Sequence, residues 1–463
     1  MQRSRLAPWL VFGGVLCLLV AIGGISSVLG DWEQTGGQQR LNALTVNLDR
    51  TAAVSAADAT GLTLEEAEAL AEQWEPQATA YSSRAQTSAR YQNSSASCTV
   101  IGVNEQYRNF NSLPMLSGSM IGQTSVTENS RVAVISSWLA EQLYRSNRVV
   151  GKQLELFGTT FTITGVYAGE ETLLKRMAED GIPDVLIPVT TFLSIQPDAS
   201  IETVQLAVGP AVAVGREDQV SAALGAVGKN PALFRIANRG INLTQAAQLK
   251  SLLLFGCGII ALVQLIRLVL RHVKAAARQL KRRLLTNHWP EALRMERAYL
   301  LKTLSVIITV LIFMVALWSS IAFRLSLLPD WVPERLIDVS FYFEHLQAIW
   351  QQQTLQAGYV PSAPEQLDAA AARLVGWLFL GGGLLGLPLL LLGIRLWQAE
   401  RMPAYAQLQR LSYYLPPAVL ITFALISWAG WDFRLNQKEI IVPGMFFLVS
   451  IFNFNESKGV DIS

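Results

Sequence analysis

Long uninterrupted apolar runs dominate the hydropathy pattern of this chain and predict membrane-spanning helices. A helix needs about 20 mostly apolar residues to cross the hydrocarbon core of a bilayer. Five runs reach or approach that length: Trp9–Gly30, Ser251–Leu270, Leu304–Phe323, Leu374–Trp397 and Leu415–Trp431. A sixth run, Ile440–Phe452, is too short and contains Pro443, so it is expected to be a re-entrant or packed tail segment.

The first apolar run has two interpretations. Val28-Leu29-Gly30 is a tolerable cleavage site for a secretory signal peptide. However, the run is longer than the apolar core of most signal peptides, which favours a retained membrane anchor. Composition agrees with several spans, because apolar residues make up 51% of the chain and charged residues only 16%, against roughly 25% charged in ordinary soluble domains.

The distribution of lysine and arginine between the spans predicts the orientation of the chain, because cytoplasmic loops are enriched in both. The loop between the second and third spans is strongly basic, whereas the loop between the third and fourth is mainly acidic. This alternation predicts a cytoplasmic N-terminus, with the segments in this order: 31–250 outside, 271–303 inside, 324–373 outside and 398–414 inside. A dedicated anionic partner is the second interpretation of the basic loop.

Between the first two spans, short alternating segments and few helices predict a mixed α+β domain. Thr63 and Glu66 form the pattern of a capping box before a helix, and Ser136 is expected to cap a second helix over Trp138–Tyr144. Phe157–Phe161 is the expected turn of a hairpin. Strands are expected at these places: Ala78–Tyr91, Ser97–Val103, Arg131–Ile135, Gln153–Phe157, Thr160–Tyr167 and Asp184–Pro188.

The two ends of this domain are expected to connect it to the membrane spans. Residues 31–50 are polar and are interpreted as a stalk, and residues 240–250 lead without a helix breaker into the second span. The predicted fold class is therefore an α+β extracytoplasmic domain inserted between the first and second spans of an α-helical membrane domain. The predicted segments are 1–30, 31–250, 251–323 with a cytoplasmic loop at 271–303, 324–373, 374–431 and a C-terminal tail at 432–463.

The sequence contains no motif for chemistry on a bound substrate. It has no G-x-x-x-x-G-K-[ST] loop for ATP, no H-E-x-x-H and no G-x-S-x-G. Its three histidines lack paired ligand spacing, and its three cysteines leave Cys98 alone in the large domain, so no disulfide is expected there. We therefore predict no enzyme activity and no catalytic, cofactor-binding or metal-binding residues, and no stretch indicates a nucleic-acid partner.

An ordered series of short motifs in the large domain resembles the extracytoplasmic domain of MacB-type ABC transporter permeases. The series is Cys98–Tyr107, Leu116-Ser117-Gly118, Arg131–Ser136, Gly151–Leu154 and Phe161–Val166. The resemblance implies a two-lobed outer domain, a homodimer or a second permease, and a separate ABC ATPase subunit. The chain departs from the family pattern by Ser119, where the family commonly has arginine, by the long loop at 324–373 and by a fifth span.

The basic inner loop contains a segment suited to a short helix. Thr286 or Asn287 would cap it, and the helix would contain the residues Trp289, Pro290, Glu291, Arg294 and Arg297. The resemblance implies that a helix here is a coupling helix that docks on the ATPase. The other interpretation is a juxtamembrane helix held at the lipid surface by Trp289 and the basic side chains.

Together these features suggest a multi-pass cell-membrane protein of permease type, without cofactors. The leading hypothesis is a permease-like subunit that couples ATP hydrolysis by a separate subunit to motion of the outer domain, in export of, or work on, a peptide, lipoprotein or antibiotic. An adaptor protein and membrane lipid are further expected partners. The alternative is an FtsX-like regulator or sensor that acts on an extracellular partner without transport.

Overall fold

The fold is described from a computed structural model, which divides into two compact units. Unit 1 contains residues 1–28, 246–325 and 374–463, and unit 2 contains residues 29–245 and 326–373. The structure describes residues 2–51, 60–74, 76–169, 172–178, 184–209, 216–285, 288–289, 294, 296–325, 343–344, 347–348, 350–351, 359, 361–399, 404–434 and 436–456.

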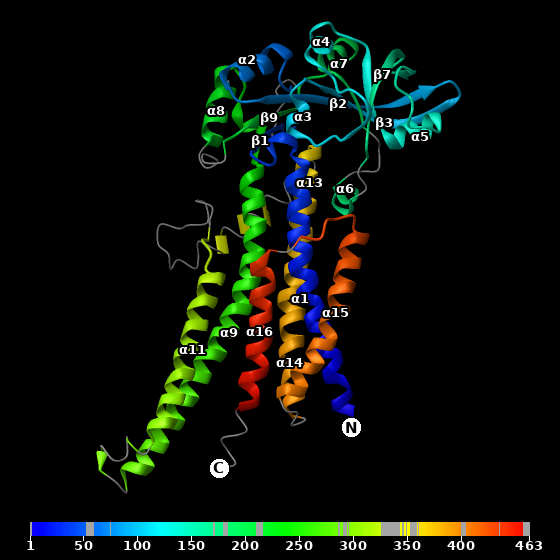
Figure 1. Ribbon diagram of the computed structural model, residues 1–463. Helices are drawn as coiled ribbons and strands as arrows, with labels where there is room; N and C mark the ends of the chain where they lie inside the picture. Colours follow the sequence, from blue (N-terminus) through cyan, green and yellow to red (C-terminus); the bar gives the residue numbers. More distant parts are fainter. Residues whose placement is uncertain are drawn as a thin grey trace. The chain divides into compact units, whose positions relative to one another are not determined.

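The described strands of unit 2 form one sheet of ten strands (Figure 1). They are β1 (Ala43–Leu48), β2 (Thr79–Tyr91), β3 (Ser94–Val103), β4 (Met115–Gly118), β5 (Val132–Ser136), β6 (Gln153–Leu156), β7 (Thr159–Tyr167), β8 (Asp184–Pro188), β9 (Thr203–Ala207) and β10 (Phe234–Asn238). Their order is β10-β1-β9-β2-β3-β8-β5-β7-β4, and β6 pairs with β2 and β7. The β3–β8 and β5–β7 pairs are parallel, so the sheet is mixed.

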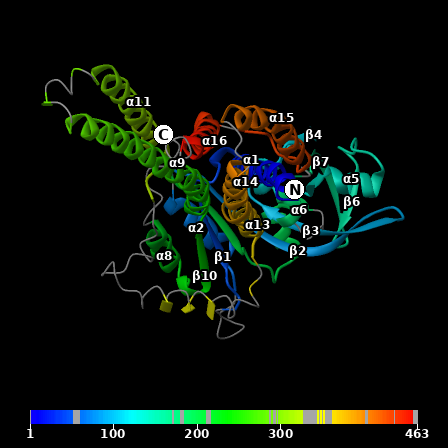
Figure 2. The ribbon, with the colours of Figure 1, turned by 90° about the horizontal axis from the view of Figure 1, so that it is seen from below.

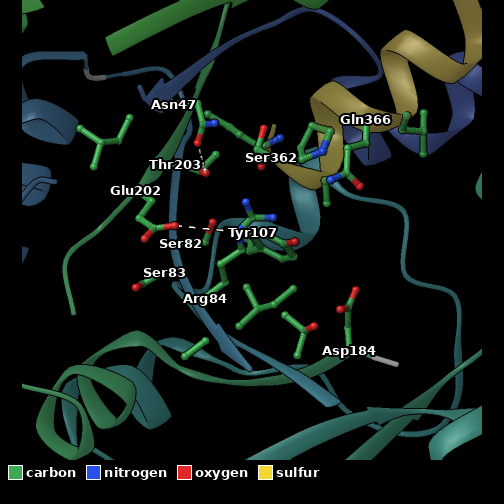
Figure 3. Close-up of a pocket in the computed structure, with 18 of the residues that line it drawn as sticks. Asn47, Ser82, Ser83, Arg84, Tyr107, Asp184, Glu202, Thr203, Ser362 and Gln366 are labelled. Atoms are coloured by element: carbon green, nitrogen blue, oxygen red, sulfur yellow. Dashed lines mark hydrogen bonds and ion pairs between the residues drawn. The ribbon is translucent and has the colours of Figure 1, made fainter. Parts of the chain in front are cut away.

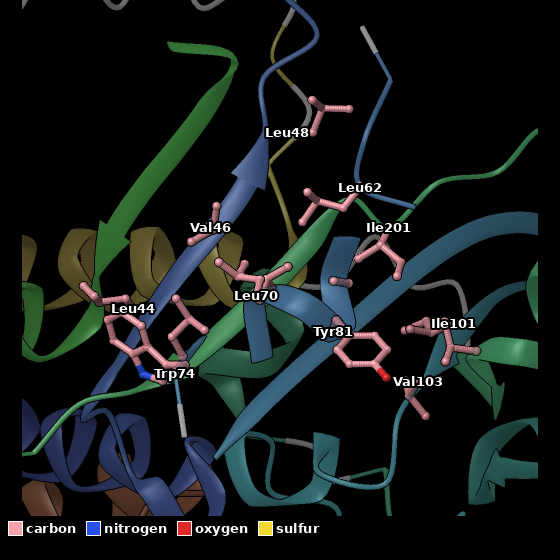
Figure 4. Packing of buried hydrophobic residues seen from close by; sticks show 14 of the residues in the cluster. Leu44, Val46, Leu48, Leu62, Leu70, Trp74, Tyr81, Ile101, Val103 and Ile201 are labelled. Atoms are coloured by element: carbon pink, nitrogen blue, oxygen red, sulfur yellow. The ribbon is translucent and has the colours of Figure 1, made fainter. Parts of the chain in front are cut away.

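Short helices between the strands complete unit 2. They are α2 (Leu64–Trp74), α3 (Tyr107–Phe110), α4 (Gln123–Thr127), α5 (Ser137–Tyr144), α6 (Leu173–Ala178), α7 (Val189–Ile195) and α8 (Arg216–Ala226), with 3-10 turns at Gly37–Gln39 and Pro231–Leu233. One core cluster includes Leu44, Val46, Leu70 and Trp74 (Figure 4). A second cluster of buried side chains lies around β5 and β7, and Phe161 and Phe192 are fully buried in it.

The local signals read from the sequence behave as expected. The Thr63 amide donates to Glu66 Oε2 and the Glu66 amide donates to Thr63 Oγ1, which is a complete capping box. Ser136 Oγ accepts from the Leu139 amide at the start of α5. Phe157 and Gly158 both have positive φ, at 50° and 74°, as a two-residue type I′ hairpin turn between β6 and β7 requires.

The interpretation of residues 31–50 as a polar stalk is wrong. Residues 2–35 form one helix, α1 (Gln2–Thr35), and residues 43–48 form β1, every residue of which is buried. β1 lies between β9 and β10, so it is an interior strand of the sheet. The polarity of the segment as a whole suggested a stalk, but β1 is paired along both edges and all its residues, including Thr45 and Asn47, are buried.

Unit 1 is built from long helices. Besides the first part of α1, they are α9 (Arg239–Leu284) from residue 246 on, α11 (Arg297–Ile321), α13 (Ala363–Leu380) from residue 374 on, a π-helical turn at Gly381–Gly386, α14 (Leu387–Ala399), α15 (Ala404–Trp428) and α16 (Gln437–Glu456). Among the described residues, five helices are long and apolar enough to cross a membrane: Leu6–Thr35, Arg239–Arg282, Arg297–Ile321, Ala363–Trp397 and Tyr405–Trp428. Each of these helices overlaps one of the five predicted spans, with different bounds.

The sixth apolar run forms a packed helix. Within α16, Val442 and Phe446 are fully buried in the core of unit 1, and Phe447 is nearly so. The helix contacts α11, α14 and α15, and Pro443 lies inside it without ending it. The expectation of a packed segment is thus confirmed.

Glycines bring α1 close to the helical segment around residues 381–393. A Cβ on Gly382 would lie 2.6 Å from Ala21 Cβ, and one on Gly386 would lie 3.0 Å from Leu18 Cγ. Gly14 of α1 is itself tight, because a Cβ there would lie 2.5 Å from the Leu390 amide nitrogen. The small-xxx-small spacing of Gly382 and Gly386 therefore marks a real close helix contact.

Candidate functional site

The predicted coupling residues lie at the start of α11 and before it. Trp289 and Arg294 are helical and exposed, Trp289 by 59%, and Arg297 is the exposed first residue of α11. Pro290 and Glu291 lie outside the described residues. Beside this segment, Gln279 Nε2 of α9 donates to Glu296 Oε2 across 2.8 Å, and Glu296 is only 8% exposed. The described residues between α9 and α11 therefore include exposed aromatic and basic side chains, and they lie next to the hydrogen bond between Gln279 and Glu296.

A buried polar cluster that the sequence did not suggest joins three helices within unit 2. Arg239 is the first residue of α9, Asp368 lies in α13 and Trp32 lies near the end of α1. The Arg239 guanidinium donates to both Asp368 oxygens over 3.0–3.2 Å, and Trp32 Nε1 donates to Asp368 Oδ1 over 2.7 Å. We call these three residues the Asp368 clasp.

Burial of the Asp368 clasp removes two charges from water, which costs free energy. Trp32 is fully buried, Arg239 is 2% exposed and Asp368 is 6% exposed. A charge pair withdrawn from water is tolerated when its geometry is good and its hydrogen-bonding groups are satisfied. Here the fork of the guanidinium meets the carboxylate with two nitrogens, and the indole supplies a further donor. Removing one partner would leave a buried charge without compensation.

A second polar network attaches the beginning of α13 to the sheet. Asn47 Nδ2 of β1 donates to the Tyr359 hydroxyl oxygen at 2.6 Å and to Glu365 Oε2 at 3.1 Å, and the Tyr359 hydroxyl donates to Glu365 Oε2 at 2.7 Å. The amide and the hydroxyl of Ser362 also donate to Glu365 Oε2. Burial, followed by the hydrogen bond to Glu365, raises the pKa of Tyr359 above its ordinary value, so this hydroxyl remains a donor. The Arg235 guanidinium lies 5.1 Å from the centre of its ring.

Unit 1 has a polar cluster of its own. Lys250 Nζ of α9 lies 2.8 Å from Glu439 Oε1 of α16, and Ser26 Oγ of α1 donates to Glu439 Oε2 at 3.0 Å. The Asn436 amide caps α16 by donating to the same carboxylate. Glu439 is 4% exposed, whereas the side chain of Lys250 is 19% exposed. We call these residues the Glu439 cluster.

Sequence reasoning missed these clusters because it treated their charges as loop or flanking charges. Asp368 and Glu365 were counted only as acidic loop residues, and Arg239 precedes the helical stretch 240–250. One signal was available: Ser362 and Glu365 have the spacing of a capping box, which predicts a helix beginning well before the apolar run at Leu374. The local sequence does not indicate which face of the sheet the start of this helix packs against.

The α11 helix presents a broad apolar surface. Only 6% of the most apolar 18-residue stretch of this helix is buried. Leu311, Ile312, Phe313, Val315 and Trp318 are all exposed. Figures 1 and 2 both show α11 beside α9 and apart from α14 and α15. In a membrane-spanning chain, such a surface suits lipid or another apolar helix.

A mixed α/β domain preceded by an apolar helix and followed by four more long apolar helices defines a multi-span membrane protein with a large inserted domain. Residues 13–227 match the family described as the MacB-like periplasmic core domain. The chain thus carries a MacB-like core domain together with several long apolar helices, an organisation that fits a MacB/FtsX-type ABC transporter permease.

Solved structures with similarity to the chain include isolated domains of two transporters. The periplasmic region of MacB from Actinobacillus actinomycetemcomitans is 17% identical, with a TM-score of 0.37, covering 45% of this chain and 92% of that one. The extracellular domain of the noncanonic ABC-type transporter YknZ from Gram-positive bacteria is 16% identical, with a TM-score of 0.34, covering 42% of this chain and 100% of that one. No curated protein matches the chain.

Proposed function

We propose that this chain is the permease-like subunit of an ABC transporter complex, in which a separate ATPase subunit drives motion of the α/β domain. The observation that carries the proposal is α9, a single helix of 46 residues that begins directly after β10 and ends at Leu284, just before the predicted coupling segment. An unbroken helix transmits displacement along its axis, because its backbone hydrogen bonds resist local compression.

In this proposal the coupling segment docks on the ATPase through Trp289, Pro290, Glu291, Arg294 and Arg297. Exposure of Trp289, Arg294 and Arg297 supports the assignment, because a docking surface must be accessible. The positive-inside rule supports a cytoplasmic position for this segment and an extracytoplasmic position for residues 31–250. The exposed apolar face of α11 supports assembly with a second permease copy within the lipid.

The Asp368 clasp has a defined part in this mechanism. It joins the first residue of α9 to α13 and to the end of α1, so displacement of α9 at Arg239 would be shared by the two other helices. No intramembrane route for a substrate is required, since work is done on the α/β domain. The species acted on outside the membrane is a peptide, a lipoprotein or an antibiotic.

The proposal is tested by reversing charge at the coupling segment. Arg294→Glu together with Arg297→Glu should abolish co-purification of the chain with the ABC ATPase in mild detergent. Arg434→Glu is a matched control, because Arg434 is also an exposed arginine but lies in another segment, between α15 and α16. Equal ATPase recovery with the double variant, the control and the unaltered chain would contradict the docking assignment.

Normal export combined with failure to activate an extracellular partner would favour the FtsX-like regulator instead.

A further inference from the structure

A cavity of about 480 Å³ lies in unit 2 against the sheet, and it has no part in the proposed coupling mechanism. Its lining comes from β1, β9, β2 and β3 and from the start of α13 (Figure 3). Half of the lining residues are polar and uncharged, including Asn47, Ser82, Thr203, Ser362 and Gln366. Its charges balance, with two arginines and two acids: Arg50 is ion-paired with Glu202, Arg84 Nε lies 3.8 Å from the same carboxylate, and Asp184 is the second acid of the lining. The cavity is therefore suited to a neutral polar group rather than to an ion.

One buried donor in the wall of this cavity has no acceptor among the described residues. Gln205 is 2% exposed, and no described residue accepts a hydrogen bond from its Nε2 atom. Its Oε1 accepts from Asn111 Nδ2 at 2.9 Å. Asn111 Nδ2 also donates to the Tyr107 carbonyl, which fixes the orientation of the asparagine amide and hence that of Gln205. An unsatisfied buried amide donor is costly, so a ligand oxygen here would be favoured.

The edge of β2 that borders the cavity is also unpaired within the described residues. Opposite β3, β2 pairs with β9 from Thr79 to Ser82 and with β6 at Arg90. Between these pairings, no strand in the described part of the chain adjoins β2 on that side. We call the gap the β2 notch.

The hydrogen-bonding groups in the notch can be assigned by alternation. The Ser82 carbonyl accepts from the Glu202 amide on the β9 side, and every second residue of a strand directs its backbone groups to the same side. Arg84, Gln86 and Ser88 therefore direct their N–H and C=O groups into the notch. Five consecutive residues, from Ser82 to Gln86, line the cavity, so the cavity runs along this part of β2.

We propose that the β2 notch and the cavity together bind an extended segment of another polypeptide by β-strand addition. The backbone of that segment pairs with Arg84, Gln86 and Ser88, and it spans about five residues, or roughly 16 Å. One of its side chains enters the cavity and accepts a hydrogen bond from Gln205 Nε2. That side chain is Asn, Gln, Ser or Thr, because half of the lining residues are polar and uncharged and the two arginines of the lining are balanced by two acids.

The test uses the full chain in lipid nanodiscs without any ATPase, so its outcome is independent of the coupling proposal. The probe is a pool of fluorescein-labelled heptapeptides with Ser, Thr, Asn or Gln at alternate positions, and anisotropy reports binding. We expect saturable binding below about 1 mM. A pool with Leu and Val at the same positions should bind about tenfold more weakly, since it leaves Gln205 unpaired.

A matched pair of variants isolates the backbone contribution. Gln86→Ala and Gln86→Pro both remove the exposed side chain, but only proline removes the N–H in the notch, at a position where an edge strand tolerates it. Proline should weaken peptide binding about fivefold to tenfold relative to alanine. Gln205→Glu keeps the acceptor for Asn111 and removes the donor at Nε2. It should therefore weaken binding of the polar peptide pool by a similar factor.

Peptides N-methylated at alternate residues provide a second measurement on the unaltered chain, so the test survives if Gln86→Pro does not fold. N-methylation should abolish measurable binding. Equal affinity of methylated and unmethylated peptides, equal affinity of the Gln86→Ala and Gln86→Pro variants, or no saturable binding would each overturn strand addition. Binding of N-acetyl-glutamine amide as tightly as the heptapeptides would also overturn it and identify a small polar amide as the occupant.

Discussion

The Asp368 clasp in unit 2 and the Glu439 cluster in unit 1 both involve a cation of α9, yet they are built differently. Arg239 and Asp368 are both buried, and the guanidinium engages its partner through two nitrogens. Lys250 keeps a fifth of its side chain exposed and meets Glu439 through a single ammonium. An arginine fork fixes orientation as well as distance, whereas a lysine is a mobile point charge on a flexible stem.

The difference indicates distinct mechanical properties at two positions of one helix. The clasp resists reorientation, because any rotation breaks two charge-assisted hydrogen bonds in a buried site. The Glu439 cluster tolerates adjustment, because Lys250 can move while solvent compensates part of its charge. We infer that α9 is held rigidly at Arg239 and more loosely at Lys250.

The largest expected effect is that of Asp368→Ala. This change leaves the Arg239 guanidinium and the Trp32 indole N–H buried without their acceptor, and it should reduce stability by about 3–5 kcal/mol. Thermal unfolding of the detergent-solubilised chain, followed by tryptophan fluorescence, measures the loss. Combining Asp368→Ala with Arg239→Met removes the stranded charge and should restore part of the stability. If the single variant is as stable as the unaltered chain, the clasp is not a stabilising contact.

A smaller effect is expected for Glu439→Ala, which removes the acceptor of Lys250 and Ser26. Because Lys250 can turn toward solvent, the loss should be about 1–3 kcal/mol and should fall below that of Asp368→Ala. The same unfolding measurement, made side by side, decides the ranking. A loss equal to or larger than that of Asp368→Ala would break the proposed contrast between rigid and adjustable attachment.

The smallest effect is expected for Tyr359→Phe at the start of α13. It removes one hydroxyl that both donates to Glu365 and accepts from Asn47, while the ring remains under Arg235. The expected loss is about 1 kcal/mol, because Glu365 keeps its bonds from Ser362 and Asn47. Hydrogen exchange of β1 amides should rise only slightly in this variant. Global loss of protection in β1 would show that the hydroxyl has a much larger role than its contacts indicate.

The clearest predictions from sequence were those with strong local causes. Apolar runs marked the five long helices, the Thr63–Glu66 spacing marked the cap of α2, and Phe157-Gly158 marked a hairpin turn that needs two positive φ angles. The motif order across residues 98–166 also led to the family whose core domain matches residues 13–227. Each of these signals involves residues close together in the chain, or a long run with one physical property.

Predictions failed or were missing where partners lie far apart in sequence. Residues 31–50 were expected to form a stalk because the segment is polar, although its strand β1 pairs with β9 and β10, which lie more than 150 residues away in the chain. The acidic residues Glu365 and Asp368 were indistinguishable from solvated loop charges until the fold placed them beside Asn47 and Arg239. Nothing in the local pattern specifies such pairings.

The sequence by itself thus determined the five membrane-length helices of the described residues, the large α/β domain and the unbroken run from residue 240 into the second span, because hydrophobic length and turn chemistry act locally. Tertiary structure alone decided that Asp368 is a buried partner of Arg239 and that, within the described residues, β2 keeps an open edge. These features depend on which distant segments meet, and the free energy of a buried polar group is set by its neighbours in space rather than by its neighbours in the chain.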